Sequence, residues 1–509
     1  MGHIVSRTGF SLAATFDVGA DLQPLRRSSR RSLPRAWWLA LCDAAVFVSA
    51  FWLGRITNWI AYGYDPYTAF MGWRIETGDQ RVIVYAAVAL AAIASFYRLG
   101  HYTRRRTFWQ ELGDVLAVVF IMALIETALI FMLRINLSRL WFVTNWSLLF
   151  LSIPFCRWAL KSALHAAGLW CRTTVIVGTG ANARDAAAAL HVEPLLGYDV
   201  VAFIAPPGSH GDWPVTVNTG DGHVPVYPPG DYPNLLPAHF TNAQVEVALE
   251  LDEFQKAGPW IKRLSHASRD VDVVSPVRGL PVASAEITHF FSHDVLSLRL
   301  KNNLAQPSAR LLKRTFDLAG ASALLAALSP LFLIIAWRIR RQGQEPFFAH
   351  ERVGQHGRRF QCLKFRTMVE DADEKLEQFL AQDLRSAAEW HGARKLKEAP
   401  RVTPVGRWLR QTSLDELPQL WNVLRGDMSL VGPRPVVADE LARYEDKVIF
   451  YLGCRPGITG LWQVSGRSDL DYRRRVHLDS WYVRNWRLWY DIVILLKTLP
   501  VPWTRDGAY

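Results

Sequence analysis

The sequence predicts a membrane protein with three folded parts: a four-helix transmembrane bundle, a Rossmann-like α/β domain, and a second α/β domain that carries a re-entrant membrane helix. Half of the 509 residues are hydrophobic, and most of the long apolar stretches lie in the first third of the chain. A short β-branched run and a glycine turn come next. A last apolar stretch is interrupted by proline and flanked by basic residues. A chain of this length exceeds one core, so several domains are expected.

Four apolar stretches near the N-terminus each approach the roughly 20 residues that a helix needs to cross a bilayer. Four in a row favour a transmembrane bundle over the buried helices of a soluble protein, and we place this bundle at 36–165. Acidic residues within or beside the stretches are expected to face other helices or water. The stretches are 36–54, 80–99, 114–135 and 141–160, and the acidic residues are Asp43, Asp114 and Glu126.

Basic residues predict which side of the membrane each segment faces. Arginine and lysine cluster before the first stretch, between the second and third, and after the fourth, whereas the other two loops carry fewer. Loops rich in these residues stay in the cytosol. We therefore expect residues 1–35 to form a basic cytosolic tail, and the chain after the fourth span to begin in the cytosol.

Residues 172–300 have the pattern of a Rossmann-like cytosolic domain. A β-branched strand runs into the GxGxxA spacing of a dinucleotide-binding turn, formed by Gly178, Gly180 and Ala183. The next predicted strand, 198–204, ends in alanine and two prolines, where dinucleotide-binding domains have a carboxylate for the ribose. We therefore favour a module that binds no dinucleotide, with a dinucleotide-binding domain as the alternative. The Pro- and Gly-rich stretch 206–237 is predicted to be loop.

The last apolar stretch, 318–337, is long enough to span a bilayer but contains Ser329 and Pro330 near its centre. Proline removes one backbone hydrogen bond of a helix, so a bend is expected there. Both flanks are basic, which places both ends in the cytosol. These features predict a re-entrant helix over 313–340. The alternative is an ordinary fifth span, which would put the rest of the chain on the other side.

Candidate phosphate-binding residues follow. The alternation over 360–366 predicts a strand with Lys364 and Arg366 on one face, and two cations on one face suit a phosphate or pyrophosphate. A solvated edge strand is an equally supported alternative. Arg352 lies in a stretch rich in basic residues and glycine, and Arg434 is fixed between two prolines in a glycine-bracketed loop suited to an anion.

Asp415 and Glu416 are candidate catalytic residues. The apolar face of a predicted helix begins just after them, with Pro418 in its first turn. The pair can cap this helix, because Ser413 and Glu416 have capping-box spacing. The same position suits catalysis: a helix N-terminus attracts phosphate, two adjacent carboxylates can hold a divalent cation, and aspartate can attack phosphorus. The cationic loops nearby favour catalysis.

Other features of the chain narrow the function less. The formal net charge of +12 is compatible with nucleic acid, anionic lipid or anionic substrates. The five cysteines are scattered without zinc-site spacing, so they support neither a disulfide framework nor a metal cluster. Trp and Tyr interleaved with Arg over 481–490 predict an interfacial amphipathic helix, with an aromatic core helix as the alternative.

With these motifs in order, residues 310–509 resemble the bacterial sugar transferase family, the polyprenyl-phosphate hexose-1-phosphate transferases. The bundle and the middle domain match long members of that family, and look most like the undecaprenyl-phosphate galactose phosphotransferases. The segments that carry the resemblance are Lys313-Arg314 with Asp317, Ser329-Pro330, Arg352-Val353-Gly354 with Gly357, Lys364-Phe365-Arg366-Thr367-Met368, Ser413-Leu414-Asp415-Glu416-Leu417-Pro418-Gln419, 429–435 and 456–460.

The resemblance implies a catalytic domain over 310–509 and a two-step transfer. Asp415 would be the nucleophile. It would take hexose-1-phosphate, with galactose as the favoured hexose, from a UDP-hexose, release UMP, and pass the group to undecaprenyl phosphate. Glu416, with Asp415, would bind Mg²⁺. The resemblance also implies phosphate or charge-stabilising roles for Arg352, Lys364, Arg366 and Arg434. It places Asp491, at a family acidic position, among the residues that bind substrate or phosphate.

The implied setting is a multi-pass protein of the bacterial inner (cytoplasmic) membrane, with its catalytic domain on the cytosolic face. Its partners would be UDP-hexose, undecaprenyl phosphate and the lipid bilayer, with no nucleic acid, and a ligand-free middle domain makes a homodimer possible. Transfer of glucose-1-phosphate is one alternative. A membrane-anchored nucleotide-sugar dehydratase is another, but it needs a Tyr-x-x-x-Lys pair, and Lys447 follows Tyr444 one residue too soon.

Overall fold

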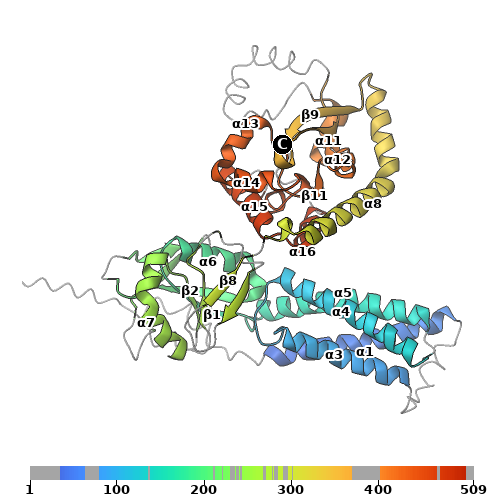
Figure 1. Cartoon of the computed structure of the whole chain (residues 1–509). Helices are drawn as coiled ribbons and strands as arrows, with labels where there is room; N and C mark the ends of the chain where they lie inside the picture. Colours follow the sequence, from blue (N-terminus) through green and yellow to red (C-terminus); the bar gives the residue numbers. More distant parts are fainter. Residues whose placement is uncertain are drawn as a thin grey trace, which may run out of the picture. The chain divides into compact units, whose positions relative to one another are not determined.

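Figure 1 shows the computed structural model of the chain. The chain divides into two compact units, Met1–Arg278 and Gly279–Tyr509, and each is described by itself. Of the predicted cytosolic tail, all but Arg35 lies outside the described residues. The structure describes residues 35–62, 80–135, 138–209, 213–219, 222–229, 236, 240, 243–267, 271–277, 279, 285–289, 296–300, 302–369, 402–466 and 471–499.

Four long apolar helices form a bundle in the first unit (Figure 1). Residues such as Phe96 and Leu149 are fully buried between them, whereas large apolar side chains such as Leu90 and Phe131 are exposed on the outside. Exposed apolar surface of this extent is typical of helices that face lipid. The four helices are α1 (Arg35–Ala61), α3 (Gln80–Arg98), α4 (Phe108–Met132) and α5 (Arg139–Ala166).

The second unit contributes a fifth long apolar helix, α8 (Pro307–Arg340). These five described helices are all long and apolar enough to cross a membrane. The chain is therefore a membrane protein. Each of the four stretches predicted to span coincides with one helix of the bundle, so the prediction of these helices is confirmed.

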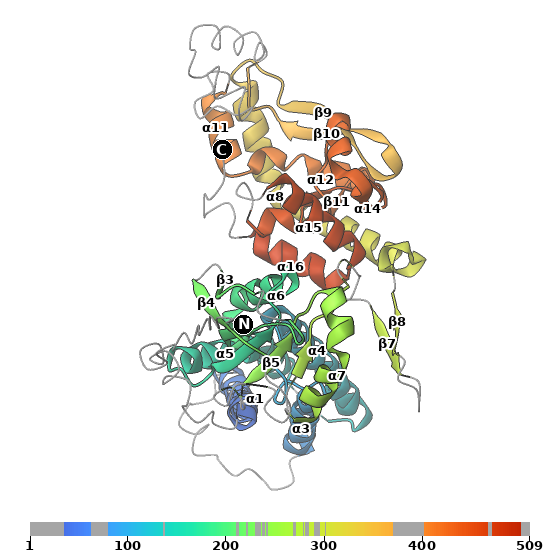
Figure 2. The same cartoon turned by 90° about the vertical axis from the view of Figure 1, so that its left-hand side faces the viewer.

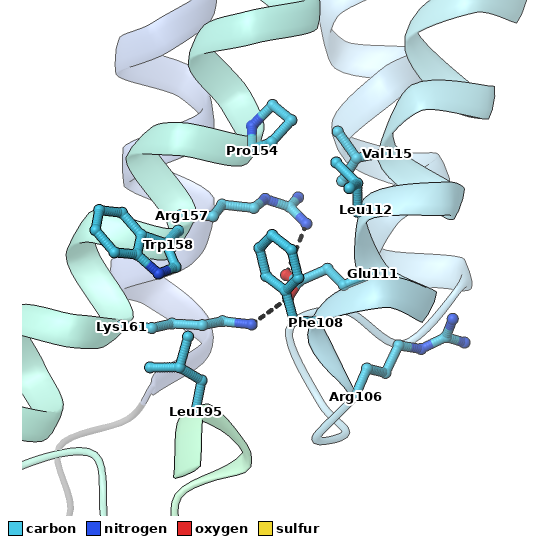
Figure 3. Close-up of a pocket in the computed structure, with 10 residues that line it drawn as sticks. All are labelled: Arg106, Phe108, Glu111, Leu112, Val115, Pro154, Arg157, Trp158, Lys161 and Leu195. Carbon is cyan, nitrogen blue, oxygen red and sulfur yellow. Dashed lines mark hydrogen bonds and ion pairs between the residues drawn. The ribbon is translucent and has the colours of Figure 1, made fainter. Parts of the chain in front are cut away.

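A buried ionic network joins α1, α4 and α5. Figure 3 shows Arg157 and Lys161 reaching from α5 towards Glu111 on α4. Arg157 donates to the two oxygens of Asp43 at 2.8 and 2.6 Å and to Glu111 at 3.1 Å. Lys161 pairs with the other oxygen of Glu111, and Tyr102 donates to Asp43 at 2.6 Å. All five side chains are buried, and every charge has an opposite charge beside it, as buried charges require.

The other two acidic residues of the predicted spans also contact protein. Glu126 is 2% exposed and accepts a hydrogen bond from Trp146 Nε1 at 2.6 Å. Asp114 forms an ion pair with Arg106. The prediction that acidic residues of the spans face other helices or water, rather than lipid, is therefore confirmed.

A six-stranded sheet follows the bundle in the first unit. Its order is β3-β4-β2-β1-β5-β6, and all neighbours are parallel except β3 and β4. Helix α6 connects β1 to β2, which is the Rossmann-like arrangement that the sequence predicts. The elements are β1 (Arg172–Val177), α6 (Ala181–Val192), η2 (Pro194–Leu196), β2 (Tyr198–Ile204), β3 (Thr216–Asn218), β4 (His223–Tyr227), β5 (Gln244–Val247), α7 (Leu251–Ala267) and β6 (Val271–Val273).

The stretch 206–237 was predicted to be loop, and this is wrong for β3 and β4, which lie within it. β4 contains Pro225, which cannot donate a ladder hydrogen bond and therefore argues against a strand in the sequence. In the structure Pro225 lies opposite Thr216 of β3, near the edge of the sheet.

The second unit packs short elements around several apolar clusters, one of which includes Leu420, Val423 and Val431. Its strands pair as β7 with β8, β9 with β10, and β11 with β12. The elements besides α8 are β7 (Glu286–His289), β8 (Leu296–Arg299), η5 (Asn303–Ala305), β9 (Phe347–Val353), η6 (Gln355–Gly357), β10 (Arg359–Phe365), α11 (Pro404–Gln411), η7 (Leu414–Glu416), α12 (Gln419–Arg425), β11 (Ser429–Val431), α13 (Ala438–Leu441), η8 (Ala442–Lys447), α14 (Val448–Leu452), β12 (Gly457–Thr459), η9 (Trp462–Val464), α15 (Tyr472–Arg484) and α16 (Leu488–Thr498).

The aromatic segment 481–490 is not a single interfacial helix. Helix α15 ends within it and α16 begins within it. Tyr482 and Trp486 are 1% and 3% exposed and belong to the core of the second unit. The alternative prediction of core aromatics is therefore correct for these two residues.

Helix α8 keeps helical structure through Ser329 and Pro330. Ser329 Oγ donates to Ala326 O at 2.8 Å, a local bond that accompanies the proline. Figure 1 shows the two halves of α8 running in different directions, so the predicted break is a bend in one helix rather than an interruption. Its re-entry into the membrane stays a prediction.

Candidate active site

Strand β10 carries Lys364 and pairs with β9 in an antiparallel hairpin (Figure 2). A side chain of α12 fastens this strand: Asn422 donates to Gln361 O at 2.8 Å and accepts from Leu363 N at 3.0 Å. Asn422 is fully buried, so it satisfies two backbone groups that would otherwise lack partners in the interior. Lys364 is thereby held beside the turn that precedes α12.

The carboxylates of Asp415 and Glu416 belong to that turn, η7, and not to α12 itself. Pro418 occupies the N-cap position of α12, and neither it nor Ser413 makes a side-chain capping bond. The predicted capping box is therefore not formed, because the helix begins later than the sequence predicts. Ser413 adopts the left-handed conformation, with φ 56° and ψ 17°. This costs a non-glycine residue on the order of 1 kcal/mol and is common in functional turns.

Lys364 contacts both carboxylates. Its Nζ lies 2.6 Å from Glu416 Oε1 and 3.8 Å from Asp415 Oδ2. The Asp415 side chain is 14% exposed and the other two are 27% exposed. The structure thus brings together three of the predicted site residues, and each of the three side chains is partly exposed.

The surroundings move the pKa values of the two carboxylates in opposite directions. Burial raises the pKa of Asp415 above its ordinary value, and the Glu416 charge adds to this while Lys364 opposes it. Burial also acts to raise the pKa of Glu416, but Lys364, Arg434 and Arg352 outweigh it and hold that pKa below its ordinary value. Neighbouring carboxylates whose pKa values are driven apart are typical of active sites.

Arg352 lies near the end of β9. Hydrogen bonds hold this strand against the segment that follows β11. Arg352 Nη1 donates to Pro435 O at 3.3 Å. The buried hydroxyl of Tyr451 donates to Val353 O at 2.7 Å and accepts from Val436 N at 3.2 Å. Val353 N also donates to Val436 O at 2.9 Å. These bonds fix the relative position of the two segments that carry the predicted arginines.

Arg434 lies in the second of those segments. Its guanidinium carbon is 5.7 Å from the centre of the Trp462 ring, and that of Arg475 is 4.9 Å from the same ring. Trp462 is buried, so it offers a fixed aromatic face for two cation–π contacts. Arg434 is near enough to the turn η7 to lower the pKa of Glu416.

Arg366 and Asp491 occupy other places. β10 ends before Arg366, whose Nε donates to Glu345 O at 3.0 Å, next to the start of β9. Asp491 is fully buried and accepts from Lys313 at 2.8 Å and from Tyr482 at 2.6 Å. A buried carboxylate with these partners favours a structural ion pair over the predicted phosphate contact. The role of Arg366 in phosphate binding stays a prediction.

Three positioning residues were not found by sequence reasoning. Asn422 and Tyr451 bind backbone atoms far away in the sequence, and neither belongs to a pattern that would reveal this. Arg314 donates to Val423 O at 2.7 Å and Leu424 O at 2.9 Å, and so satisfies carbonyls at the end of α12. Of the three, only Arg314 could have been identified from the sequence, because it lies in one of the segments that carry the family resemblance.

The residues that could hold a metal ion are the adjacent carboxylates of Asp415 and Glu416. Within the parts of the chain that the structure describes, no three or more His, Cys, Asp and Glu side chains form a metal-binding group. Mg²⁺ usually keeps several waters and is held by one or two carboxylates together with substrate phosphates. An adjacent acidic pair with no further protein ligand fits that ion.

Comparison with known proteins now identifies the family. Residues 308–505 match the family described as bacterial sugar transferase. The undecaprenyl-phosphate galactose phosphotransferase of Salmonella typhimurium is 42% identical over 476 residues, which cover 93% of this chain and 97% of that protein. The UDP-galactose-lipid carrier transferase of Erwinia amylovora is 43% identical over 433 residues, which cover 85% of this chain and 89% of that protein.

A third relative, from Caulobacter vibrioides, is a UDP-glucose:undecaprenyl-phosphate glucose-1-phosphate transferase. It is 39% identical over 229 residues, which cover 43% of this chain and 79% of that protein. The first two relatives, by contrast, match most of the chain. The chain is therefore a transferase, and it belongs to the bacterial sugar transferase family.

Proposed function

We propose that the enzyme transfers hexose-1-phosphate from a UDP-hexose to undecaprenyl phosphate with release of UMP, and that the hexose is galactose. The observation that carries this proposal is the contact of Lys364 with both Asp415 and Glu416. It joins a nucleophile, a second carboxylate and a cation, which is a set suited to transfer between two anions. The reaction would be the first membrane step of exopolysaccharide, capsule or O-antigen synthesis.

In the first step, a carboxylate oxygen of Asp415 attacks the phosphorus atom next to the sugar. A bond forms between this oxygen and phosphorus, and the bond from phosphorus to the bridging oxygen of the diphosphate breaks. UMP leaves with that oxygen and its electron pair. The phosphosugar stays on Asp415 as an acyl phosphate. Lys364 and Arg434 are suited to offset the charge that develops on the phosphate oxygens.

In the second step, a phosphate oxygen of undecaprenyl phosphate attacks the same phosphorus. The bond to Asp415 breaks, and the product is undecaprenyl-diphosphate-hexose. Asp415 returns to its ionised form with the electron pair of the broken bond. The two displacements need no net proton transfer, so the site requires cations rather than a general base.

Asp415 and Glu416 would hold Mg²⁺ in this reaction. The bound ion would neutralise charge on the diphosphate of the donor. The lowered pKa of Glu416 keeps its carboxylate ionised and available as a ligand.

We further propose that α8 enters and leaves the membrane on the cytosolic side. Ala321, in its first half, and Ile339, in its second half, both pack on cores of the second unit. Leu333 is 69% exposed between them, as expected for a lipid contact. Labelling of Glu345→Cys in intact cells by a membrane-impermeant reagent would show that the helix spans, contrary to this proposal. The basic loops and the cytosolic location of UDP-hexoses support our proposal that the protein lies in the bacterial inner membrane, with its catalytic domain on the cytosolic face.

The identity of the hexose is tested by UMP release. Purified enzyme in nanodiscs with undecaprenyl phosphate is given a panel of UDP-sugars. Galactose is proposed because the two long relatives are named for it, whereas the glucose enzyme matches less than half of the chain. The highest kcat/KM is expected with UDP-galactose. A higher kcat/KM with UDP-glucose would favour the second candidate, and no release with any UDP-sugar would reject the transfer itself.

A homodimer is also proposed. Among the residues that the structure describes, strands β7 and β8 pair only with each other, and strand edges without a partner are templates for pairing with another chain. Mass measurement of the enzyme in nanodiscs is expected to give two copies, and a single copy would contradict this proposal.

A further inference from the structure

The glycine turn of the Rossmann-like domain has no part in the proposed transfer. We propose that its ligand is Glu250 of the same chain: the carboxylate permanently fills the place where a dinucleotide phosphate would bind, and closes the domain to dinucleotides. The inference concerns the first unit alone and does not depend on the reaction of the second.

Glu250 lies in the short connection between β5 and α7 and reaches the N-terminus of α6. Its Oε1 accepts a hydrogen bond from Asn182 N at 2.7 Å. Asn182 is the second residue of α6, which begins at Ala181, so its N–H is among the donors that find no partner within the helix. In dinucleotide-binding domains the same end of the first helix binds the pyrophosphate. The carboxylate thus supplies the negative charge that a phosphate would bring.

The close approach of segment 248–250 also explains why both positions of the turn are occupied by glycine. Gly178 has φ +124°, and a Cβ there would lie 2.4 Å from Ala248 O. Gly180 has φ −73°, which any residue adopts. A Cβ on Gly180 would nevertheless lie 2.6 Å from Glu250 Oε1. In dinucleotide-binding domains such glycines make room for the cofactor and for close packing, whereas here they make room for the chain itself.

Two further contacts hold Glu250 in place. Asn182 Nδ2 donates to Leu249 O at 3.0 Å, and Glu250 N donates to Glu253 Oε2 at 2.9 Å. The connection is therefore tied to α6 on one side and to the first turn of α7 on the other. An incoming phosphate would have to displace a carboxylate of like charge from this position.

The end of β2 lacks the second feature that dinucleotide binding requires, a carboxylate for the ribose. A carboxylate there would accept the ribose hydroxyls, but the residue after the strand is Ala205, which is fully buried. Pro206 follows it. The domain thus lacks the ribose contact as well as a free phosphate site.

Amide hydrogen exchange of the Asn182 peptide in the full-length protein tests the contact. Glu250→Ala is expected to speed this exchange at least about tenfold, because bonds to charged groups contribute roughly 1.5–3 kcal/mol. Glu250→Gln keeps an acceptor oxygen and is expected to give a smaller change. Asp252→Ala removes a neighbouring exposed carboxylate as a control and should change nothing. Unchanged exchange in Glu250→Ala would overturn the inference.

Gly180→Ala gives a second test, because its methyl group would push the flexible Glu250 side chain away. Exchange at Asn182 is expected to rise as in Glu250→Ala, and the double variant should exchange no faster than either single one. Effects that multiply would mean that the two residues act separately, against the inference. In parallel, the wild-type protein is titrated with NAD⁺ by calorimetry. No saturable binding is expected, and saturable binding would contradict the closed site.

Discussion

The Lys364 ammonium lies 2.6 Å from the Glu416 carboxylate, and this contact organises the candidate site. Two adjacent carboxylates repel each other, so they are stable side by side only when cations offset their charge. Lys364 does this from β10, while Arg352 and Arg434 act from two other segments. The contact therefore joins the parts of the site that come from distant places in the sequence.

Lys364→Met is expected to reduce transfer by about 10²–10³-fold, as loss of a single charge-stabilising group at a reacting centre does. UMP release measures this. Arg359→Met is a matched control, because Arg359 belongs to the same strand but pairs with Glu351 at the surface, at 3.0 Å. The control should transfer at the wild-type rate. An equal loss of transfer rate in the two variants would show that Lys364 only supports the structure of the strand and does not stabilise the reacting charge.

Tyr451→Phe is expected to raise KM for the UDP-hexose roughly tenfold, because small displacements of binding groups are costly. The variant keeps the buried ring but loses the hydroxyl, and with it the two hydrogen bonds that connect Val353 to Val436. Steady-state kinetics and thermal unfolding are measured together. Tyr472→Phe is the control from the same cluster, since its hydroxyl donates only weakly, to Glu440 O at 3.4 Å. If both variants change KM equally, Tyr451 does not position the arginines.

Asp479 makes stability depend on pH. It is 4% exposed, and burial raises its pKa to about 8, although Tyr444 donates to it at 2.9 Å. An unfolded aspartate has a pKa of about 3.9, so between these values only the folded state holds the proton. Protonated Asp479 therefore stabilises the folded state. This stabilisation is complete below the pKa that Asp479 has in the unfolded state, and it is lost as pH rises through the pKa that it has in the folded state. Tm should therefore fall between about pH 5 and about pH 8, and Asp479→Asn should flatten this fall. An equal slope in both proteins would contradict the assignment.

Arg157→Leu is expected to destabilise the membrane bundle by about 3–5 kcal/mol, because Asp43 would remain buried without its cation. Thermal unfolding in nanodiscs measures the loss. The double variant Asp43→Leu with Arg157→Leu should lose less than the sum of the two single variants, since it leaves neither charge of the pair alone. Strictly additive losses would mean that the two side chains do not form the pair.

The spans could be predicted from the sequence, but their ends could not. Helix α5 continues to Ala166, beyond the predicted stretch 141–160, and it includes the charged Lys161. Hydropathy counts each charge as if it stood alone in lipid. Lys161 pairs with Glu111 of α4, and no local pattern in either helix reveals that pairing.

The site could be predicted in part. The family resemblance placed Lys364 in one site with Asp415 and Glu416, and the structure brings these three residues into contact. The same reasoning placed Asp491 among the substrate-binding residues. Its partner Lys313 stands 178 positions earlier in the chain, and a buried ion pair formed over that separation depends on tertiary packing.

The covalent bond between Asp415 and the hexose phosphate is the central claim of the proposed mechanism. It is tested by intact-mass and peptide-mass measurement of the enzyme mixed with UDP-galactose in the absence of undecaprenyl phosphate. The mechanism predicts one hexose-phosphate adduct on the Asp415 peptide, its removal when undecaprenyl phosphate is added, and no adduct in Asp415→Asn, which should still insert into the membrane. Wild-type transfer by Asp415→Asn, or an adduct on another residue, would contradict it.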